Sequence, residues 1–227
     1  FNEGSGTAAD DASINNNTAT LDGAAWTAGK FGAALSFATS GYAEAADIAA
    51  LTPGAQATFS AWVYLNAAPG EVASIFNKWS QSADDEYLLG INPDRTLYFT
   101  WQTAGGGAWG TGSFNDAKGV GMVPLGAWTH VALVRNGPSM SFYLNGVLDV
   151  ALSAAADAAA FRNGVNTLRV GGQAHGGFNR FLNGRVDEPR IYSRALSQTE
   201  IQADMNAPIA VAPVDIPPAA PRGLTPR

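Results

Sequence analysis

The sequence predicts an all-β protein, an antiparallel two-sheet β-sandwich of the jelly-roll type with one short helix near its C-terminal end. Three observations predict this class: short runs rich in β-branched and aromatic residues, Gly and polar clusters between them, and very little helical periodicity. Many short strands at regular spacing are typical of sandwiches and jelly rolls. At 227 residues, the chain is long enough for one such domain.

The predicted strands follow one another closely from residue 58 onward. They cover residues 58–65, 86–91, 96–102, 128–135, 140–144, 147–150, 167–170 and 185–192. Asn145-Gly146 separates two of them and predicts a type I′ hairpin, because both residues tolerate positive φ. Asn136-Gly137 is expected to form a second turn in the same way.

Helix is expected only near the end of the sandwich. Ser197 and Glu200 have the spacing of a capping box, which predicts a short helix beginning there. From residue 207 the chain becomes rich in proline, and such a segment favours extended polyproline II rather than a packed core. We therefore expect a sandwich over residues 1–206 and a linker over 207–227 that tethers it to further domains. Residues 221–225 resemble the lead-in to a fibronectin type III module.

The charge balance and the lack of cysteine exclude several functions. Lys and Arg number 13 against 19 Asp and Glu, a net charge of −6, so the basic surface that nucleic acids or anionic membranes attract is missing. No apolar run approaches the roughly 20 residues of a membrane span. The absence of Cys excludes disulfides, thiol nucleophiles and Cys-zinc sites, and it fits a bacterial exterior.

A set of motifs, in order along the chain, resembles the laminin-G-like, concanavalin A-like jelly rolls of bacterial multidomain secreted proteins. The matching segments are residues 1–6, 10–17, 29–37, 59–63, 128–132, 142–147 and 186–197. Residues 1–6 look like the opening strand and turn of the family, and 29–37 looks like its next strand. The resemblance extends to about residue 206 and implies the fold and a secreted or cell-surface location. It implies less about activity, because this fold hosts binders, adhesion modules and enzymes.

The resemblance also implies a structural calcium ion near one edge of the sandwich. The residues implied as its ligands are Asp11, Asn15, Asn17 and Asp187, which offer the oxygen atoms that calcium prefers. The loop departs from the family pattern at Ile14 and Asn16, where Gly is usual. The alternative is that the loop side chains only form Asx-turns.

The sequence shows no catalytic constellation. The Glu-x-Asp-x-x-Glu pattern of related glycan hydrolases is absent, and the consecutive Asp84, Asp85 and Glu86 cannot all share one strand face. Nucleophile-elbow, zinc-protease and phosphate-loop motifs are absent too. His130 alternates with apolar residues and is expected to be packed and hydrogen-bonded. We therefore expect no enzymatic activity.

A glycan site needs aromatic planes and a few polar groups. Alternation along residues 96–102 places Trp101 in the core and Tyr98 and Gln102 on the other face. Loop aromatics that the core does not need are further candidates, although each alone is also compatible with a partly buried rim position. The predicted set is Trp79, Tyr98, Gln102, Trp109, His175, Phe178 and Arg180.

The function predicted first is a monomeric, non-catalytic, lectin-like module that binds a polysaccharide or other glycan and belongs to a secreted or cell-surface bacterial protein. One alternative is an adhesion or spacer module that binds protein or no ligand. A second alternative is a divergent polysaccharide-degrading enzyme.

Overall fold

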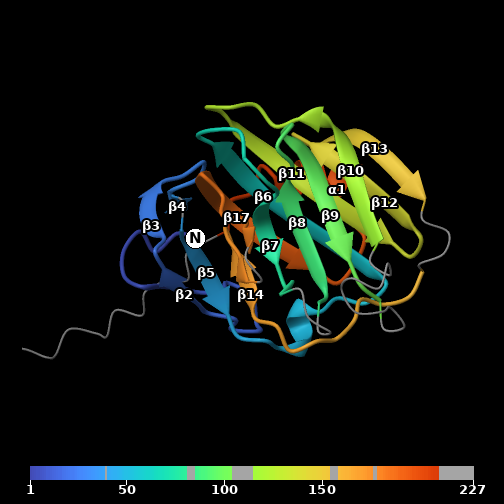
Figure 1. Ribbon diagram of the computed structural model, residues 1–227, viewed down its shortest axis with the longest axis horizontal. Coiled ribbons are helices and arrows are strands. Elements are labelled where there is room, and N and C mark those ends of the chain that lie inside the picture. Colours follow the sequence, from blue (N-terminus) through green and yellow to red (C-terminus); the bar gives the residue numbers. More distant parts are fainter. Residues whose placement is uncertain (39, 81–84, 104–114, 154–157, 176–177, 210–227) are drawn as a thin grey trace, which may run out of the picture.

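The computed structural model describes residues 1–209 except 39, 81–84, 104–114, 154–157 and 176–177, and only the backbone of residues 115, 174–175 and 178–179. Two large sheets pack face to face as a β-sandwich (Figure 1), and all the pairings between their strands are antiparallel. The predicted all-β jelly-roll sandwich with one short helix is therefore confirmed.

Each sheet combines strands from distant parts of the chain. The eight-stranded sheet contains, in spatial order, β1 (Ala8–Ala9), β2 (Ala19–Asp22), β5 (Tyr42–Ala45), β14 (Leu168–Val170), β7 (Ala73–Asn77), β8 (Tyr87–Ile91), β9 (Thr96–Trp101) and β10 (Asn115–Met122). The seven-stranded sheet contains β13 (Val147–Ser153), β12 (Ser139–Leu144), β11 (Trp128–Asn136), β6 (Gln56–Leu65), β17 (Gly184–Tyr192), β4 (Ala33–Phe37) and β3 (Ala25–Ala28). A small ribbon of β15 (Ala174–His175) and β16 (Phe178–Asn179), the 3₁₀ turn η1 (Ala49–Leu51) and the helix α1 (Gln198–Asp204) complete the described fold.

Aromatic residues fill the space between the sheets. Phe59 of β6 meets Tyr87 of β8 at 4.8 Å and Phe99 of β9 at 5.7 Å between ring centroids. Trp101 is 2% exposed and stacks on Phe99, so its predicted place in the core is confirmed. Offset and edge contacts of this kind add to the free energy already gained by burying the rings.

The two predicted turns have different geometries. Asn145 and Gly146 have φ of 50° and 72°, as the predicted type I′ hairpin between β12 and β13 requires. Between β11 and β12, however, Asn136 still pairs with Ser139, so the two loop residues are Gly137 and Pro138. A turn between these strands is therefore present as predicted, but Gly137 and Pro138 form it instead of Asn136 and Gly137. It is not of type I′, because the ring of Pro138 fixes a negative φ and that type needs two positive ones.

The outer face of the seven-stranded sheet is covered by α1. The predicted capping box is present: Glu200 N–H donates to Ser197 Oγ at 3.3 Å, and Ser197 N–H donates to Glu200 Oε2 at 2.7 Å. Ile201 then packs against Ala132 and Tyr143 of the sheet. This small second core holds α1 against the sheet.

His130 lies on the same outer face and is buried, 2% exposed, with its ring 5.4 Å from that of Trp62. The prediction of a packed histidine is confirmed. The backbone N–H of His130 donates to Asn145 Oδ1 at 3.0 Å, whereas Nδ1 of the ring has no partner in the described part of the chain. Burial lowers the pKa of His130 to about 4, so the ring is neutral at pH 7.

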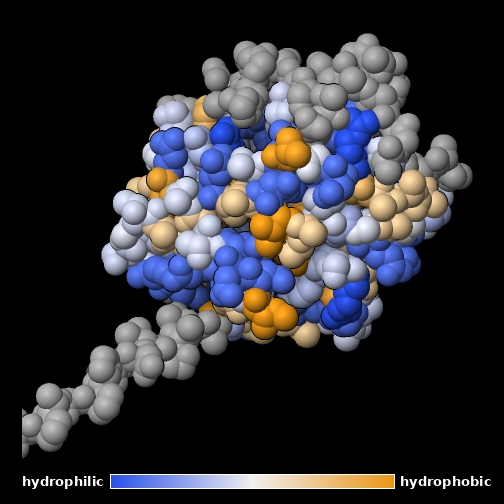
Figure 2. Space-filling model, turned by 90° about the horizontal axis from the view of Figure 1, so that it is seen from below, coloured by the Kyte–Doolittle hydropathy of each residue, from blue (hydrophilic) through white to orange (hydrophobic). Residues whose placement is uncertain are grey.

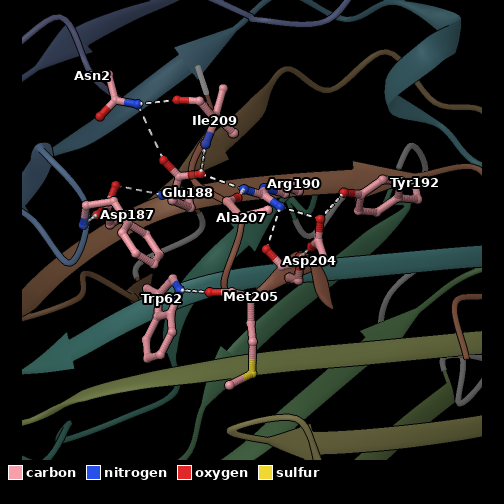
Figure 3. Close-up of polar contacts among 12 residues, drawn as sticks. Asn2, Trp62, Asp187, Glu188, Arg190, Tyr192, Asp204, Met205, Ala207 and Ile209 are labelled. Atoms are coloured by element: carbon pink, nitrogen blue, oxygen red, sulfur yellow. Dashed lines mark hydrogen bonds and ion pairs between the residues drawn. The ribbon is translucent and has the colours of Figure 1, made fainter. Parts of the chain in front are cut away.

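Both ends of the described chain meet at β17, where an irregularity lies between Asp187 and Arg190 (Figure 3). Glu188 adopts φ of 52° there, and its Oε2 accepts hydrogen bonds from Arg190 Nη2 and from the N–H of Ile209, each at 2.6 Å. Asn2 donates to the carbonyl of Ile209 at 2.7 Å. Residues 207–209, predicted as the start of the linker, are thus tied to the sandwich, and 210–227 lie outside the described residues.

Candidate functional site

Polar side chains of β7, β9 and β10 lie on the outer face of the eight-stranded sheet, where β8 between them contributes the apolar Leu88. Strand alternation turns Leu97, Phe99 and Trp101 into the core, so Tyr98 and Thr100 point the other way. Tyr98 lies opposite Gly90 of β8 and Lys118 of β10, in one row across the sheet. We call the outer side of these strands, together with the segment 173–180 that follows β14, the polar face.

The segment after β14 returns across this sheet and fixes Arg180 on the polar face. The carbonyl of Arg180 accepts the N–H of Ser74 in β7 at 3.0 Å. Burial lowers the pKa of the Arg180 guanidinium, and Tyr98, Glu71 and Asp85 oppose that shift by attraction. The structure therefore brings Tyr98 and Arg180, two of the predicted site residues, into one electrostatic environment.

Tyr98 is the partly exposed aromatic ring of this face. Burial and the nearby charge of Asp116 raise the pKa of its hydroxyl, so Tyr98 stays protonated and can donate a hydrogen bond at pH 7. Asp116 and Lys118 of β10 are exposed beside it. The arrangement offers a ring face, a hydroxyl donor and charged groups on adjacent rows of the sheet.

Two glutamine amides on the polar face lack hydrogen-bond partners. Gln102 and Gln173 are both 0% exposed, and neither amide has a partner among the residues that the structure describes. The backbone of Gln102 is fixed, because its N–H donates to the carbonyl of Glu86 at 2.8 Å. Leaving a buried amide unpaired costs about 1–3 kcal/mol, so a polar partner is expected at both positions.

Gln173 lines a small polar pocket of about 20 Å³ at the edge of this face. The pocket is lined by Asn77, Trp79, Ser80, Asn166, Thr167, Arg169 and Gln173. Its size suits one water molecule or one small polar group. Gln173 is the first residue of segment 173–180, which is rich in polar, aromatic and glycine residues. That composition is the feature of the sequence that could have pointed to Gln173.

Trp79 is placed differently from the prediction. It was expected as a loop aromatic available to a ligand, but its side chain is 2% exposed. Its N–H donates to Asn77 Oδ1 at 2.5 Å, and the next residue, Ser80, donates its N–H to Asp85 Oδ1 at 2.7 Å. These local hydrogen bonds turn the chain inward directly after β7, so Trp79 is a wall of the pocket rather than an exposed platform.

The other predicted ligand residues are less completely described. Trp109 lies outside the described residues. His175 and Phe178 face each other as a backbone pair in the β15–β16 ribbon, and their side chains are not described. Of the predicted residues, Tyr98 and Arg180 share one electrostatic environment, Gln102 follows Tyr98 with the alternation of β9, and Trp79 lines the small pocket with Gln173. The structure also adds Asn77, Asp85 and Gln173, which the sequence interpretation did not select.

A buried ion pair anchors the strand ends next to the polar face. Lys78 Nζ lies 3.0 Å from Glu86 Oε1 and 2.6 Å from Asp47 Oδ1, and the side chains of Lys78 and Glu86 are fully buried. Thr52 donates its hydroxyl to Glu86 Oε2 at 2.6 Å. Burial raises the pKa of Glu86 against these stabilising contacts. The pair fixes the ends of β7 and β8, from which Trp79 and Asp85 extend.

The predicted calcium ligands have other partners. Asp11 accepts hydrogen bonds from Ser13 N–H, Ser13 Oγ and Asn17 N–H at 2.7–2.9 Å. Burial acts to raise the pKa of Asp11, but these bonds outweigh it and the pKa is lowered. Such bonds to the loop backbone are the Asx-turn arrangement named as the alternative.

Asp187 has a different environment (Figure 3). It is fully buried and accepts the N–H groups of Phe31 and Glu188, each at 2.8 Å, while burial raises its pKa. Asp11, Asn15 and Asn17 line a cavity to which Asp187 does not contribute. No group of three or more acidic, His or Cys side chains able to hold a metal occurs among the described residues. These contacts leave the implied ion untested, and calcium stays a prediction.

The remaining surface carries both polar and hydrophobic residues. On the face shown in Figure 2, a few strongly hydrophobic residues lie between polar ones. Within the part of the chain that the structure describes, we find no helix that is both long and apolar enough to span a membrane.

Comparisons with solved structures agree with the sandwich fold. Domain 4 of AbnA, an extracellular GH43 arabinanase of Geobacillus stearothermophilus solved with arabinotriose, matches with a TM-score of 0.61 at 20% identity, over 82% of this chain and 87% of that one. A proposed carbohydrate binding protein from Bacteroides ovatus matches with a TM-score of 0.55 at 16% identity, over 74% of this chain and 45% of that one. The binding domain of botulinum neurotoxin DC, solved with rat synaptotagmin II, matches with a TM-score of 0.59 at 15% identity, over 84% of this chain and 47% of that one.

The chain thus spans about half the length of the last two structures. At these identities the likeness concerns the fold. The comparison with curated proteins found no match. A family model of the laminin G type matches residues 37–202. Because this match covers most of the chain, the protein belongs to the concanavalin A-like lectin/glucanases superfamily.

Proposed function

We propose that the protein is a non-catalytic carbohydrate-binding module of an extracellular bacterial protein and that its polar face binds the glycan. The observation that carries this proposal is the pair of fully buried amides of Gln102 and Gln173, which have no hydrogen-bond partner among the described residues. An amide offers both a donor and an acceptor, which is what a sugar hydroxyl needs. A site built to hydrogen-bond hydroxyls leaves such groups unpaired when no ligand is bound.

The surroundings of the two amides suit a sugar. The partly exposed ring of Tyr98 offers an apolar surface beside the Arg180 guanidinium, and Asp116 and Lys118 supply exposed charged groups at the rim. Sugars combine apolar ring faces with hydroxyl edges, so a site of this composition can contact both.

The comparisons favour the same class of ligand. The arabinanase domain that shares this fold was solved with arabinotriose, which makes arabinan oligosaccharides the first ligands to test. That domain also belongs to an extracellular enzyme, which supports a secreted or cell-surface location.

The absence of catalysis is also a proposal. Glycoside hydrolysis needs two carboxyl groups that both reach the scissile bond. Among the described residues next to the polar face, the adjacent carboxyl groups are those of Asp85 and Glu86, both 0% exposed, and Glu86 is paired with Lys78. These carboxyl groups contribute to structure rather than to an open catalytic cleft.

Binding to immobilised arabinan and a panel of other polysaccharides tests the proposal. We expect the wild-type protein to be retained, and Gln102→Met and Gln173→Met each to weaken binding at least tenfold. Each substitution keeps the side-chain length but removes a buried unpaired amide, so stability should be unchanged or raised by about 1 kcal/mol. Gln56→Met is the matched control, because Gln56 is exposed at the start of β6 on the other sheet.

Two results would contradict the proposal. Folded wild-type protein that no polysaccharide retains would favour the adhesion or spacer alternative, to which the toxin domain solved with synaptotagmin lends some support. Release of reducing ends or unsaturated sugars from any polysaccharide would instead establish the enzyme alternative.

A further inference from the structure

A second site lies between the sheets, away from the polar face. A cavity of about 510 Å³ separates one half of the eight-stranded sheet from β17. Its walls include Phe76, Leu168 and Val170 from the eight-stranded sheet and Ile191 from β17. Tyr98, Gln102, Gln173 and Arg180 do not line it. This volume is within the range of small-molecule pockets, which are about 300–1,000 Å³.

Small side chains create this space. The cavity wall on the side of the eight-stranded sheet contains Ala43 and Ala45 of β5, Ala9 of β1 and Ala19 of β2. Protein interiors are otherwise packed almost without voids larger than a water molecule. A large cavity walled by alanines on one side and by larger apolar residues on the other is therefore a place for a ligand.

The mouth of the cavity is polar and acidic. The loop that carries Asp10, Asp11, Asn15 and Asn17 lines it on one side. Arg190 lines it as well, but its guanidinium pairs with Glu188 and Asp204, so it does not offer an unpaired positive charge. An acidic mouth of this kind disfavours ligands with a carboxylate or phosphate head.

We propose that this cavity binds a small apolar molecule that is neutral or cationic, with its apolar part between the sheets and any polar end at the Asp10–Asn17 loop. The site does not depend on the proposed glycan function, because its lining side chains face the core rather than the outer surface. The protein would then carry two ligand sites of different chemistry on one sandwich.

The neutral fluorescent probe N-phenyl-1-naphthylamine tests the proposal directly. We expect a saturable, blue-shifted fluorescence increase with the wild-type protein, and weaker binding of an anionic naphthalene sulfonate probe. Ala45→Leu should reduce the affinity for the neutral probe at least tenfold by filling the cavity. Ala25→Leu is the control, because it adds the same apolar group at an exposed position of β3. Absence of saturable binding, or equal binding by Ala45→Leu, would overturn the proposal.

A stability measurement shows whether the space exists in solution. Ala45→Leu should leave Tm unchanged or raise it by about 2–4 °C, because the added side chain is buried without displacing its neighbours. Ala73→Leu, at a position that is 1% exposed and does not line the cavity, should lower Tm by overpacking. Equal losses in the two variants would show that the cavity is closed, and the proposal would fail. Ala45→Leu should retain glycan binding and Gln102→Met should retain probe binding, so the cavity proposal and the glycan proposal are tested independently.

Discussion

The two halves of the eight-stranded sheet differ in how they meet the opposite sheet. Across β8 and β9 the core positions carry Tyr87, Leu89 and Phe99, and rings from both sheets interlock around Phe59. Across β1, β2 and β5 the corresponding positions are largely alanine, and a 510 Å³ cavity remains. One half is a close-packed support for the polar face, and the other half is an open compartment. The same backbone architecture thus yields rigidity or a binding space according to side-chain volume.

The largest expected effect is on the packed half, at its buried ion pair. Lys78→Met leaves the carboxylate of Glu86 uncompensated in the interior, so the free energy of unfolding should fall by about 3–5 kcal/mol. Replacing both residues, as Lys78→Met with Glu86→Leu, should recover most of this loss, because the fully buried carboxylate is removed and only the partly exposed Asp47 loses its partner. Chemical denaturation of the three proteins measures the effect. A double variant as unstable as the single one would show that the pair itself, rather than its uncompensated charge, stabilises the strand ends.

A matched pair of leucines compares the halves directly. Leu89 is 0% exposed inside the packed half, whereas Leu168 is 7% exposed and forms a wall of the cavity. Leu89→Ala should cost about 2–5 kcal/mol, and Leu168→Ala roughly half as much, because its neighbours already lack partner atoms on the cavity side. The unfolding free energies of both variants check this. Equal costs would show that the two halves are packed alike.

A pH dependence should come from His130, on the outer face of the other sheet. Its pKa in the folded protein is about 4, below the ordinary value of 6.5, so the unfolded chain binds a proton more readily. Stability is therefore lost as the pH falls from about 6.5 toward 4, by about 2 kcal/mol at pH 5. His130→Phe should remove this contribution, so its unfolding free energy should change less between pH 7 and pH 5 than that of the wild type. Identical pH profiles would assign the acid sensitivity to other groups.

The smallest expected effect is in the loop at the mouth of the open half. Asp11→Asn, measured in EDTA, should lower the free energy of unfolding by about 1 kcal/mol, because the carboxylate accepts bonds from Ser13 and Asn17. The predicted calcium ion would add roughly 2.7 kcal/mol to the wild type at 100 times its Kd, and this addition should be lost in the variant. Wild-type melting curves that coincide in calcium and in EDTA would leave the loop as an Asx-turn alone.

Much of the fold follows from residues whose effect is local. Alternating β-rich runs predicted β6, β9 and β11 within a few residues of their observed bounds. The alanine strand β5 and the glycine-containing β10 were not predicted, because alanine and glycine have low strand propensity and pair here through their neighbours. The opening strand expected at residues 1–6 is absent, and β1 begins only at Ala8.

The candidate site was predictable only in part. Alternation correctly separated Trp101 from Tyr98, because the strand period of two fixes which face each side chain takes. Trp79 was placed at the surface although it is buried, since a sequence does not show that the turn after β7 folds inward. Gln173 was not selected, because an amide becomes informative only when its burial and its lack of partners are known.

The sequence by itself determined the strand-rich class, the Asn145-Gly146 hairpin and the capped helix at Ser197, since each depends on backbone preferences of adjacent residues. Only the tertiary structure decided that Ala43 and Ala45 border a cavity and that Gln102 and Gln173 lie buried on one face. The physical reason is that volume and hydrogen-bond satisfaction depend on which residues lie opposite one another. In this sandwich, those neighbours come from strands more than a hundred residues apart, as in the pairing of Val170 with Ala43.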